Sequence, residues 1–152
     1  MTPHERVLEK LKVAGVPYET LHHEPMGKSE EVARLRGVDL HTGAKALVVR
    51  GAKTNTPYLL IMPADLKLDG QAVKAVLGEK VDFAKDVVEL TGCVPGSVPP
   101  FGSIFNIRTI VDPRLAENER LNFNAGTLTD SINMRYDDWV KTEKPEIAPI
   151  AK

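Results

Sequence analysis

The sequence predicts a single α+β domain, and three observations support this fold class. The chain has 152 residues, which is enough for one domain with a sizeable hydrophobic core. Segments with helical periodicity alternate with short runs of β-branched and aliphatic residues, bounded by Gly, Pro and Asn turns. Neither an internal repeat nor a second domain is visible. We therefore expect one domain over residues 1–141 and a loose C-terminal tail over residues 142–152.

Composition and charge exclude several classes of protein. No apolar run approaches the roughly 20 residues that a membrane span needs, and the charged N-terminus lacks the apolar segment of a signal peptide. A single cysteine cannot form an internal disulfide, which indicates a reducing, cytoplasmic setting. The net charge of −1 gives no overall basic field for nucleic acid, so any RNA contact must be local. Four scattered histidines and one cysteine form no metal-ligand pattern, and we expect no cofactor.

The first element is a helix with a clear beginning and end. Thr2 is a suitable N-cap, Pro3 suits the first helical position, and Glu5 completes a capping box with Thr2. The apolar residues that follow recur on one helical face, and Gly15 ends the helix.

Two β-hairpins are expected further along the chain. The aliphatic run Ala44–Arg50 and the run Pro57–Met62 flank a polar turn. In the same way, Leu121–Asn124 and Ser131–Met134 flank the turn Ala125–Asp130.

Shorter elements complete the domain. We expect strands at Tyr18–His22, Lys80–Phe83 and Ser103–Val111, and helices from Ser29 to about Gly37 and over Asp69–Leu77, Lys85–Leu90 and Tyr136–Lys141.

The segment Thr91–Gly102 is the most informative stretch of the chain. It holds three of the 11 glycines and three of the 11 prolines, with apolar residues between them. Glycine reaches backbone conformations closed to other residues, whereas proline fixes φ and removes an N–H donor. This composition predicts a stiff loop whose bare backbone forms the wall of a pocket.

Single residues give weaker signals. Lys45 starts an apolar strand: its amine either lies in solvent at a strand edge or meets a phosphate or carboxylate at a pocket mouth. Cys93 is either a small buried thiol or a nucleophile, but no histidine is near it in sequence. His22 and His23 end a strand without other ligand residues at metal-binding spacing. The Asn124-Ala125-Gly126 run is explained by a turn alone, although Thr127 after it offers a hydroxyl to a pocket.

Taken together and in order, three segments resemble the YbaK/prolyl-tRNA synthetase-associated editing domain family. The segments are GAKALVV (Gly43–Val49), ELTGCVPGSVPPFG (Glu89–Gly102) and LNFNAGTLTDSI (Leu121–Ile132). Their order and spacing match over nearly the whole chain, from about Val16 to Trp139. The resemblance implies a mixed, mostly antiparallel, barrel-like sheet flanked by helices.

The resemblance also implies an activity and a site. Members of the family hydrolyse the ester of mischarged aminoacyl-tRNA, so aminoacyl-tRNA is the implied substrate and an aminoacyl-tRNA synthetase a possible partner. The residues implied in catalysis are Lys45 and the Gly-x-x-x-Pro segment, Gly96, Ser97, Val98, Pro99 and Pro100. The residues implied in binding the tRNA 3′ end and its amino acid are His23, Phe101, Gly102, Asn124, Ala125, Gly126 and Thr127.

The sequence departs from one branch of the family. Where the cysteine-removing branch carries a Gly-Gly-Arg-rich segment, this chain has Asn124-Ala125-Gly126-Thr127. This resembles the free-standing ProX-type branch instead, which favours alanine, serine or threonine over cysteine. Two other functions stay open: a non-catalytic tRNA- or synthetase-binding module, and a hydrolase of another activated ester that uses Cys93 or a histidine.

Overall fold

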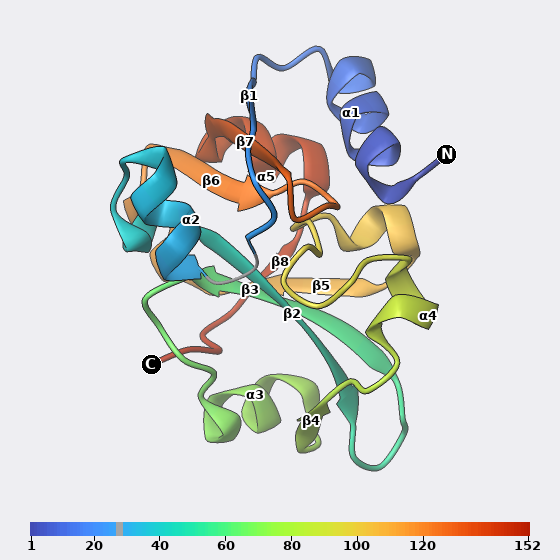
Figure 1. Ribbon diagram of the computed structural model, residues 1–152. Helices are drawn as coiled ribbons and strands as arrows, with labels where there is room; N and C mark the ends of the chain where they lie inside the picture. Colours follow the sequence, from blue (N-terminus) through green and yellow to red (C-terminus); the bar gives the residue numbers. More distant parts are fainter. Residues whose placement is uncertain (27–28) are drawn as a thin grey trace.

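The computed structural model describes residues 1–26 and 29–152 of the chain (Figure 1). The helices are α1 (Pro3–Ala14), α2 (Ser29–Arg36), α3 (Gly70–Leu77), α4 (Val87–Thr91) and α5 (Tyr136–Glu143), with short 3-10 helices η1 (Leu40–Thr42), η2 (Gly102–Phe105) and η3 (Pro113–Glu117). The strands are β1 (Glu19–His22), β2 (Ala44–Gly51), β3 (Pro57–Pro63), β4 (Val81–Phe83), β5 (Arg108–Val111), β6 (Arg120–Asn124), β7 (Asp130–Arg135) and β8 (Glu146–Ile147).

The strands form two sheets. The five-stranded sheet has the order β4-β2-β3-β5-β8, and the three-stranded sheet has the order β1-β7-β6. Both expected hairpins are confirmed, because β2 pairs antiparallel with β3 and β6 with β7. Parallel pairing occurs where β5 lies between β3 and β8. The fold is therefore the expected mixed, mostly antiparallel α+β domain, although the described strands do not close into a barrel.

The hydrophobic core lies on both faces of the five-stranded sheet. Alternate residues of a strand point to opposite faces, so neighbours on β3 enter different parts of the core. Leu59 and Ile61 pack in the larger part, toward α1, α5 and the inner face of the three-stranded sheet. Leu60 and Met62 pack on the other side, with Val73 of α3. Figure 1 shows α3 below the five-stranded sheet and the three-stranded sheet above it.

The N-terminal helix begins as expected. The Thr2 hydroxyl accepts a hydrogen bond from the Glu5 amide, the Glu5 carboxylate accepts one from the Thr2 amide, and Gly15 ends the helix with φ of 69°. No helix in the described part of the chain has the length and apolar character needed to cross a membrane.

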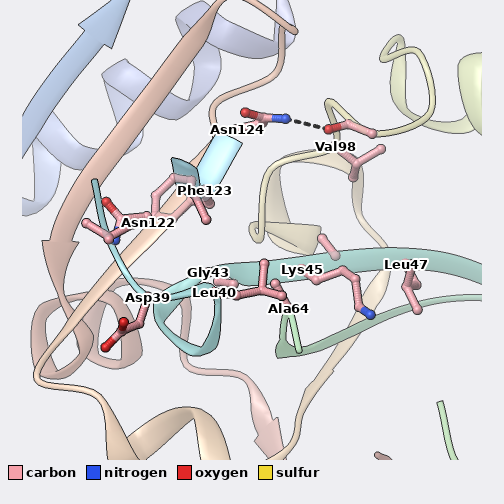
Figure 2. Close-up of a pocket in the computed structure, with 15 residues that line it drawn as sticks. Asp39, Leu40, Gly43, Lys45, Leu47, Ala64, Val98, Asn122, Phe123 and Asn124 are labelled. Carbon is pink, nitrogen blue, oxygen red and sulfur yellow. Dashed lines mark hydrogen bonds between the residues drawn. The ribbon is translucent and has the colours of Figure 1, made fainter. Parts of the chain in front are cut away.

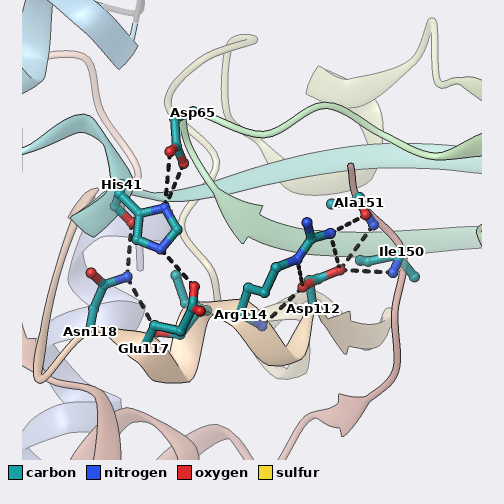
Figure 3. Close-up of polar contacts among 9 residues, drawn as sticks. His41, Asp65, Asp112, Arg114, Glu117, Asn118, Ile150 and Ala151 are labelled. Carbon is teal, nitrogen blue, oxygen red and sulfur yellow. Dashed lines mark hydrogen bonds and ion pairs between the residues drawn. The ribbon is translucent and has the colours of Figure 1, made fainter.

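The C-terminal segment differs from the expected loose tail. The last turn of α5 and β8 lie within it, and Ile150 is fully buried. The buried Asp112 carboxylate accepts hydrogen bonds from the Ile150 and Ala151 amides at 3.0 Å each (Figure 3). The sequence pattern could not predict these contacts, because Asp112 lies far from the C-terminal segment along the chain.

The strand expected over Ser103–Val111 is also shorter than the apolar run suggested. Residues Gly102–Phe105 form the 3-10 helix η2, and pairing begins only at Arg108. Asn106 separates the two elements in a left-handed conformation with φ of 56°. This conformation breaks an extended strand, which explains the difference.

Candidate active site

We call the segment Thr91–Gly102 the Gly/Pro loop. A cavity of about 180 Å³ lies where the start of β2 meets the end of β6 and this loop (Figure 2). Of the residues implied by sequence, it brings together Lys45, Gly96, Val98 and Asn124. Small and apolar residues supply most of the remaining wall, and they come from α2, the segment around η1, β2, the residue after β3, and β6. They are Ala33, Val38, Leu40, Gly43, Ala44, Ala46, Leu47, Ala64 and Phe123. The polar residues Asp39 and Asn122 complete the lining.

Lys45 lies at the edge of this cavity with its amine anchored. It sits opposite Met62 in the β2–β3 ladder, and its Nζ donates a 2.5 Å hydrogen bond to the Leu66 carbonyl. Burial lowers the pKa of the amine below its ordinary value, although the negative charges of Glu30 and Asp65 act to raise it. Figure 2 shows the amine directed away from Val98 and Asn124. The Lys45 amine is therefore not directed at the loop.

The Gly/Pro loop is held by its own carbonyl groups. Gly96 adopts a φ of 90°, a conformation that favours glycine. The Gly96 carbonyl accepts a 2.6 Å hydrogen bond from Nδ2 of Asn124, and the Ser97 carbonyl accepts one from the Gly126 amide at 3.0 Å. Farther along, Trp139 Nε1 donates to the Pro100 carbonyl at 2.9 Å. The loop is thus fixed to the β6–β7 turn at one end and to α5 at the other.

The backbone amides of the same loop differ in whether they have a hydrogen-bond partner. Pro99 and Pro100 have no N–H, and the Ser97 amide donates to the Val94 carbonyl at 3.1 Å. Within residues 1–26 and 29–152, the amides of Gly96 and Val98 make no hydrogen bond. Both residues line the cavity. Beside the cavity, the loop therefore has two N–H donors without a hydrogen-bond partner in the described part of the chain.

The β6–β7 turn supports the loop more than it lines the cavity. Gly126 has φ of 91°, and a Cβ there would meet the backbone of His4 in α1. Ala125 is fully buried, and its carbonyl contacts Nδ1 of His4 at 2.7 Å. The Thr127 hydroxyl donates to the Asp130 carboxylate at 2.6 Å, which caps the turn. Of the four turn residues implied by sequence, Asn124 alone lines the cavity.

Three further residues implied in substrate binding lie outside the cavity lining. His23 contacts the Ser131 hydroxyl through Nε2 at 2.7 Å, and this hydroxyl donates to Oδ1 of Asn124, a cavity residue, at 3.4 Å. Phe101 is fully buried and packs edge-on against Phe123, with ring centroids 5.6 Å apart. A Cβ on Gly102 would collide with the Thr109 side chain, so glycine is required there for packing. Phe101 and Gly102 thus pack beside the site, whereas His23 is linked to it through Ser131 and Asn124.

Asn122 is a site residue that sequence reasoning missed. It is 4% exposed and lines the cavity, with Nδ2 donating to the Thr42 hydroxyl at 3.1 Å and Oδ1 accepting from Asn133 at 2.8 Å. A signal was present, because strand residues two apart share a face and Asn122 and Asn124 are two apart on β6. The wall from Val38 to Leu40 had no comparable signal, since it follows a helix end without a recognisable motif.

Cys93 shows the properties of a structural thiol. It is 1% exposed, its Sγ contacts the Thr91 carbonyl at 3.6 Å, and burial raises the pKa of the thiol. A raised pKa disfavours the thiolate that a nucleophile requires. The described residues also contain no cluster of His, Cys, Asp or Glu that could hold a metal ion.

The chain is similar to known proteins over most of its length. The profile of the aminoacyl-tRNA editing domain matches residues 23–142. The chain is 36% identical over 150 residues to the multifunctional Ser/Thr-tRNA deacylase ProXp-y of Escherichia coli K12, which covers 95% of this chain and 90% of the relative. It is 22% identical over 151 residues to the prolyl-tRNA editing protein ProX of Acetoanaerobium sticklandii, covering 95% and 92% of the two chains.

A solved structure shows the same fold over almost the full length. It belongs to the hypothetical protein APE2540, with a TM-score of 0.89, 27% identity and coverage of 97% of this chain and 99% of that one.

Proposed function

This chain belongs to the aminoacyl-tRNA editing domain family, and we propose that it is a trans-editing deacylase for tRNAs mischarged with a small amino acid. One observation supports the proposal most directly. One cavity is lined by a half-buried cation, Lys45, and by two loop residues, Gly96 and Val98, whose amides make no hydrogen bond in the described part of the chain. These are the groups that ester hydrolysis needs when neither a metal nor a nucleophilic side chain takes part.

The reaction asks the protein for positioning and charge stabilisation. An aminoacyl ester is already activated, so a bound water can attack its carbonyl carbon once the two are held in line. The carbonyl oxygen then becomes negatively charged, and the Gly96 and Val98 amides stabilise it. When the carbon–oxygen ester bond breaks, the proton released by the water passes to the departing ribose oxygen. The neighbouring hydroxyl of the terminal ribose carries that proton, and the products are the free amino acid and the uncharged tRNA end.

Lys45 binds the nucleotide end of the substrate in this proposal. An ammonium group has three N–H donors, and the Leu66 carbonyl occupies one of them. The remaining donors suit a phosphate or ribose oxygen of the terminal adenosine. The direction of the amine, away from Val98 and Asn124, separates this contact from the reacting carbonyl.

The lining of the cavity favours a small amino acid. Its wall consists mostly of small and apolar residues, so the site is suited to act as a second sieve for amino acids that a synthetase has wrongly attached. We propose serine and threonine as the first substrates to test, with alanine next and cysteine last, because a relative is named a Ser/Thr-tRNA deacylase. An apolar pocket rejects an added hydroxyl only weakly, so mixed specificity is expected.

A synthetase partner and a cytoplasmic location form part of the same proposal. The proline–tRNA ligase of Nautilia profundicola is 31% identical over 108 residues, which cover 68% of this chain but only 19% of the ligase. In that ligase, a similar domain is part of a synthetase. The present chain has a net charge of −1 and so lacks an overall basic field to attract tRNA, which suits a domain that receives tRNA from a synthetase partner.

A deacylation assay tests the proposal. Purified protein is incubated with Ser-, Thr-, Ala- and Cys-charged tRNAs, alone and with synthetases added, and the remaining ester is measured over time. We expect cleavage by the wild type and its loss in Lys45→Ala. Lys53→Ala serves as the matched control, because Lys53 is exposed at the far end of the β2–β3 hairpin. Binding of tRNA without cleavage would favour the binding-module function instead.

A further inference from the structure

His41 bridges three separate segments beside the candidate active site (Figure 3). Its Nδ1 lies 2.8 and 3.0 Å from the two carboxylate oxygens of Asp65, and its Nε2 lies 3.1 Å from Oε1 of Glu117. Its backbone carbonyl accepts a 2.9 Å hydrogen bond from Asn118. One imidazole therefore links η1, the chain after β3 and the end of η3.

The chain after β3 is the segment that anchors the Lys45 amine. We call residues 63–68, which lead from β3 toward α3, the anchoring turn. Leu66, the acceptor for Lys45 Nζ, follows directly after Asp65, the partner of His41. Any shift of Asp65 therefore moves the atom that fixes the Lys45 amine. The charge of Asp65 also acts on Lys45 directly, since it favours the charged amine.

The far side of the anchoring turn is held by the C-terminal segment. The backbones of Lys67 and Lys152 exchange two hydrogen bonds of 2.8 Å. Asp112 and Arg114 in turn hold the C-terminal segment, because Asp112 accepts from the Ile150 and Ala151 amides and Arg114 donates to the Ala151 carbonyl (Figure 3). The turn is thus fixed through backbone pairing at one end, and through the side chain of His41 at the other.

We propose that His41 is a positioning residue of the deacylase site, which sets the place of the Lys45 amine through Asp65 and the Leu66 carbonyl. This inference rests on the proposed function, because it assigns a purpose to the place of that amine. His41 itself does not line the cavity, so its effect on the substrate passes through Lys45.

The bridge depends on the charge of His41. Burial on its own lowers the pKa of the imidazole, but the hydrogen bonds and charges of Asp65 and Glu117 outweigh it and raise the pKa above the ordinary value. The cations that act on the same carboxylates are Arg114, on both, and Lys45, on Asp65. A raised pKa means that the bridge is complete at low pH. It weakens as the pH rises through that pKa.

Two measurements on a set of variants test the inference. The first is single-turnover deacylation over a range of pH, with folding checked by thermal unfolding. The second is the NMR titration of Lys45 after reductive ¹³C-methylation, assigned with Lys45→Arg, which reports on the amine without any tRNA. His41→Asn removes the bridge, whereas His41→Arg keeps a cation that does not titrate. Glu117→Gln weakens the bridge, and Glu119→Gln is its matched control, since Glu119 pairs with Arg135 on the surface.

We expect His41→Asn to lower kcat/KM about tenfold or more and to shift the Lys45 resonance, because small displacements of a binding group are costly. Glu117→Gln should have a smaller effect in the same direction, and Glu119→Gln none. Wild-type activity should decline as the pH rises through the pKa of His41, because the bridge then weakens. His41→Arg should recover part of the activity and lose this decline. Unchanged activity and an unchanged Lys45 resonance in His41→Asn would overturn the inference. If the wild type cleaves no ester, the proposed function fails, while the Lys45 titration still decides whether His41 positions the amine.

Discussion

The side-chain amide of Asn124 donates a 2.6 Å hydrogen bond to the carbonyl oxygen of Gly96, across 28 positions of the sequence. Together with the bond from the Gly126 amide to the Ser97 carbonyl, it fixes the Gly/Pro loop to the β6–β7 turn. The carbonyls of Gly96 and Ser97 are thus both hydrogen-bonded to this turn. In the function proposed above, this fixation holds the amides of Gly96 and Val98 in place as oxyanion donors.

Replacing Asn124 should therefore impair activity more than stability. In Asn124→Asp the donor becomes an anionic oxygen beside the Gly96 carbonyl, which repels it and lets the loop move. We expect kcat/KM for the charged tRNA to fall about tenfold or more, because misplaced oxyanion donors lose their effect. Asn124→Ser, which keeps a shorter donor, should retain more activity than Asn124→Asp. Equal activity in the wild type and Asn124→Asp would contradict a role for this bond.

Gly126→Ala should destabilise the protein by more than its backbone conformation alone explains. Alanine at a φ of 91° is strained, and its Cβ would also meet the backbone of His4. Gly15→Ala is the matched control, because Gly15 has φ of 69° and nothing within 4 Å of an added Cβ. We expect the control to lose about 1 kcal/mol of unfolding free energy and Gly126→Ala clearly more. Urea unfolding of both variants measures the difference, and equal losses would show that the contact with α1 has no effect.

Cys93→Ala should leave deacylation unchanged. The thiol is buried, and its raised pKa keeps it protonated at neutral pH. Removing the sulfur from the core should cost about 1 kcal/mol of stability, as other small core truncations do. The assay with charged tRNA, run at a temperature where the variant is folded, checks the activity. Loss of cleavage in a folded Cys93→Ala would make the thiol the nucleophile of a different hydrolase.

Local sequence signals predicted the elements but not the contacts between them. The capping box of Thr2 and Glu5 and the β2–β3 hairpin are set by neighbouring residues, and both are confirmed. The C-terminal segment was misjudged because its order depends on Asp112, a buried carboxylate nearly 40 positions away. The same limit applies to the site. Lys45 and the Gly/Pro loop have recognisable motifs, whereas the His41–Asp65 bridge is created only by the fold.

Glu79 should make the protein sensitive to acid. This buried carboxylate accepts hydrogen bonds from the Thr54 hydroxyl and amide, the Lys53 amide and the Tyr58 hydroxyl, and its pKa is lowered from 4.5 to about 2, chiefly by Thr54. A carboxyl group with a lowered pKa stabilises the folded state above its unfolded pKa, and that stability is lost as the pH falls through the folded value. We therefore expect the urea midpoint of the wild type to fall between about pH 4.5 and pH 2.

The Glu79→Gln variant separates this group from the other carboxylates. Its amide cannot accept all four hydrogen bonds, so the variant should be less stable than the wild type at pH 7. Because it no longer titrates, the gap between the two proteins should narrow as the pH falls toward 2. Glu119→Gln, which alters an exposed carboxylate, should follow the wild type over the whole range. A gap that stays constant from pH 7 to pH 2 would show that Glu79 does not have the lowered pKa assigned to it.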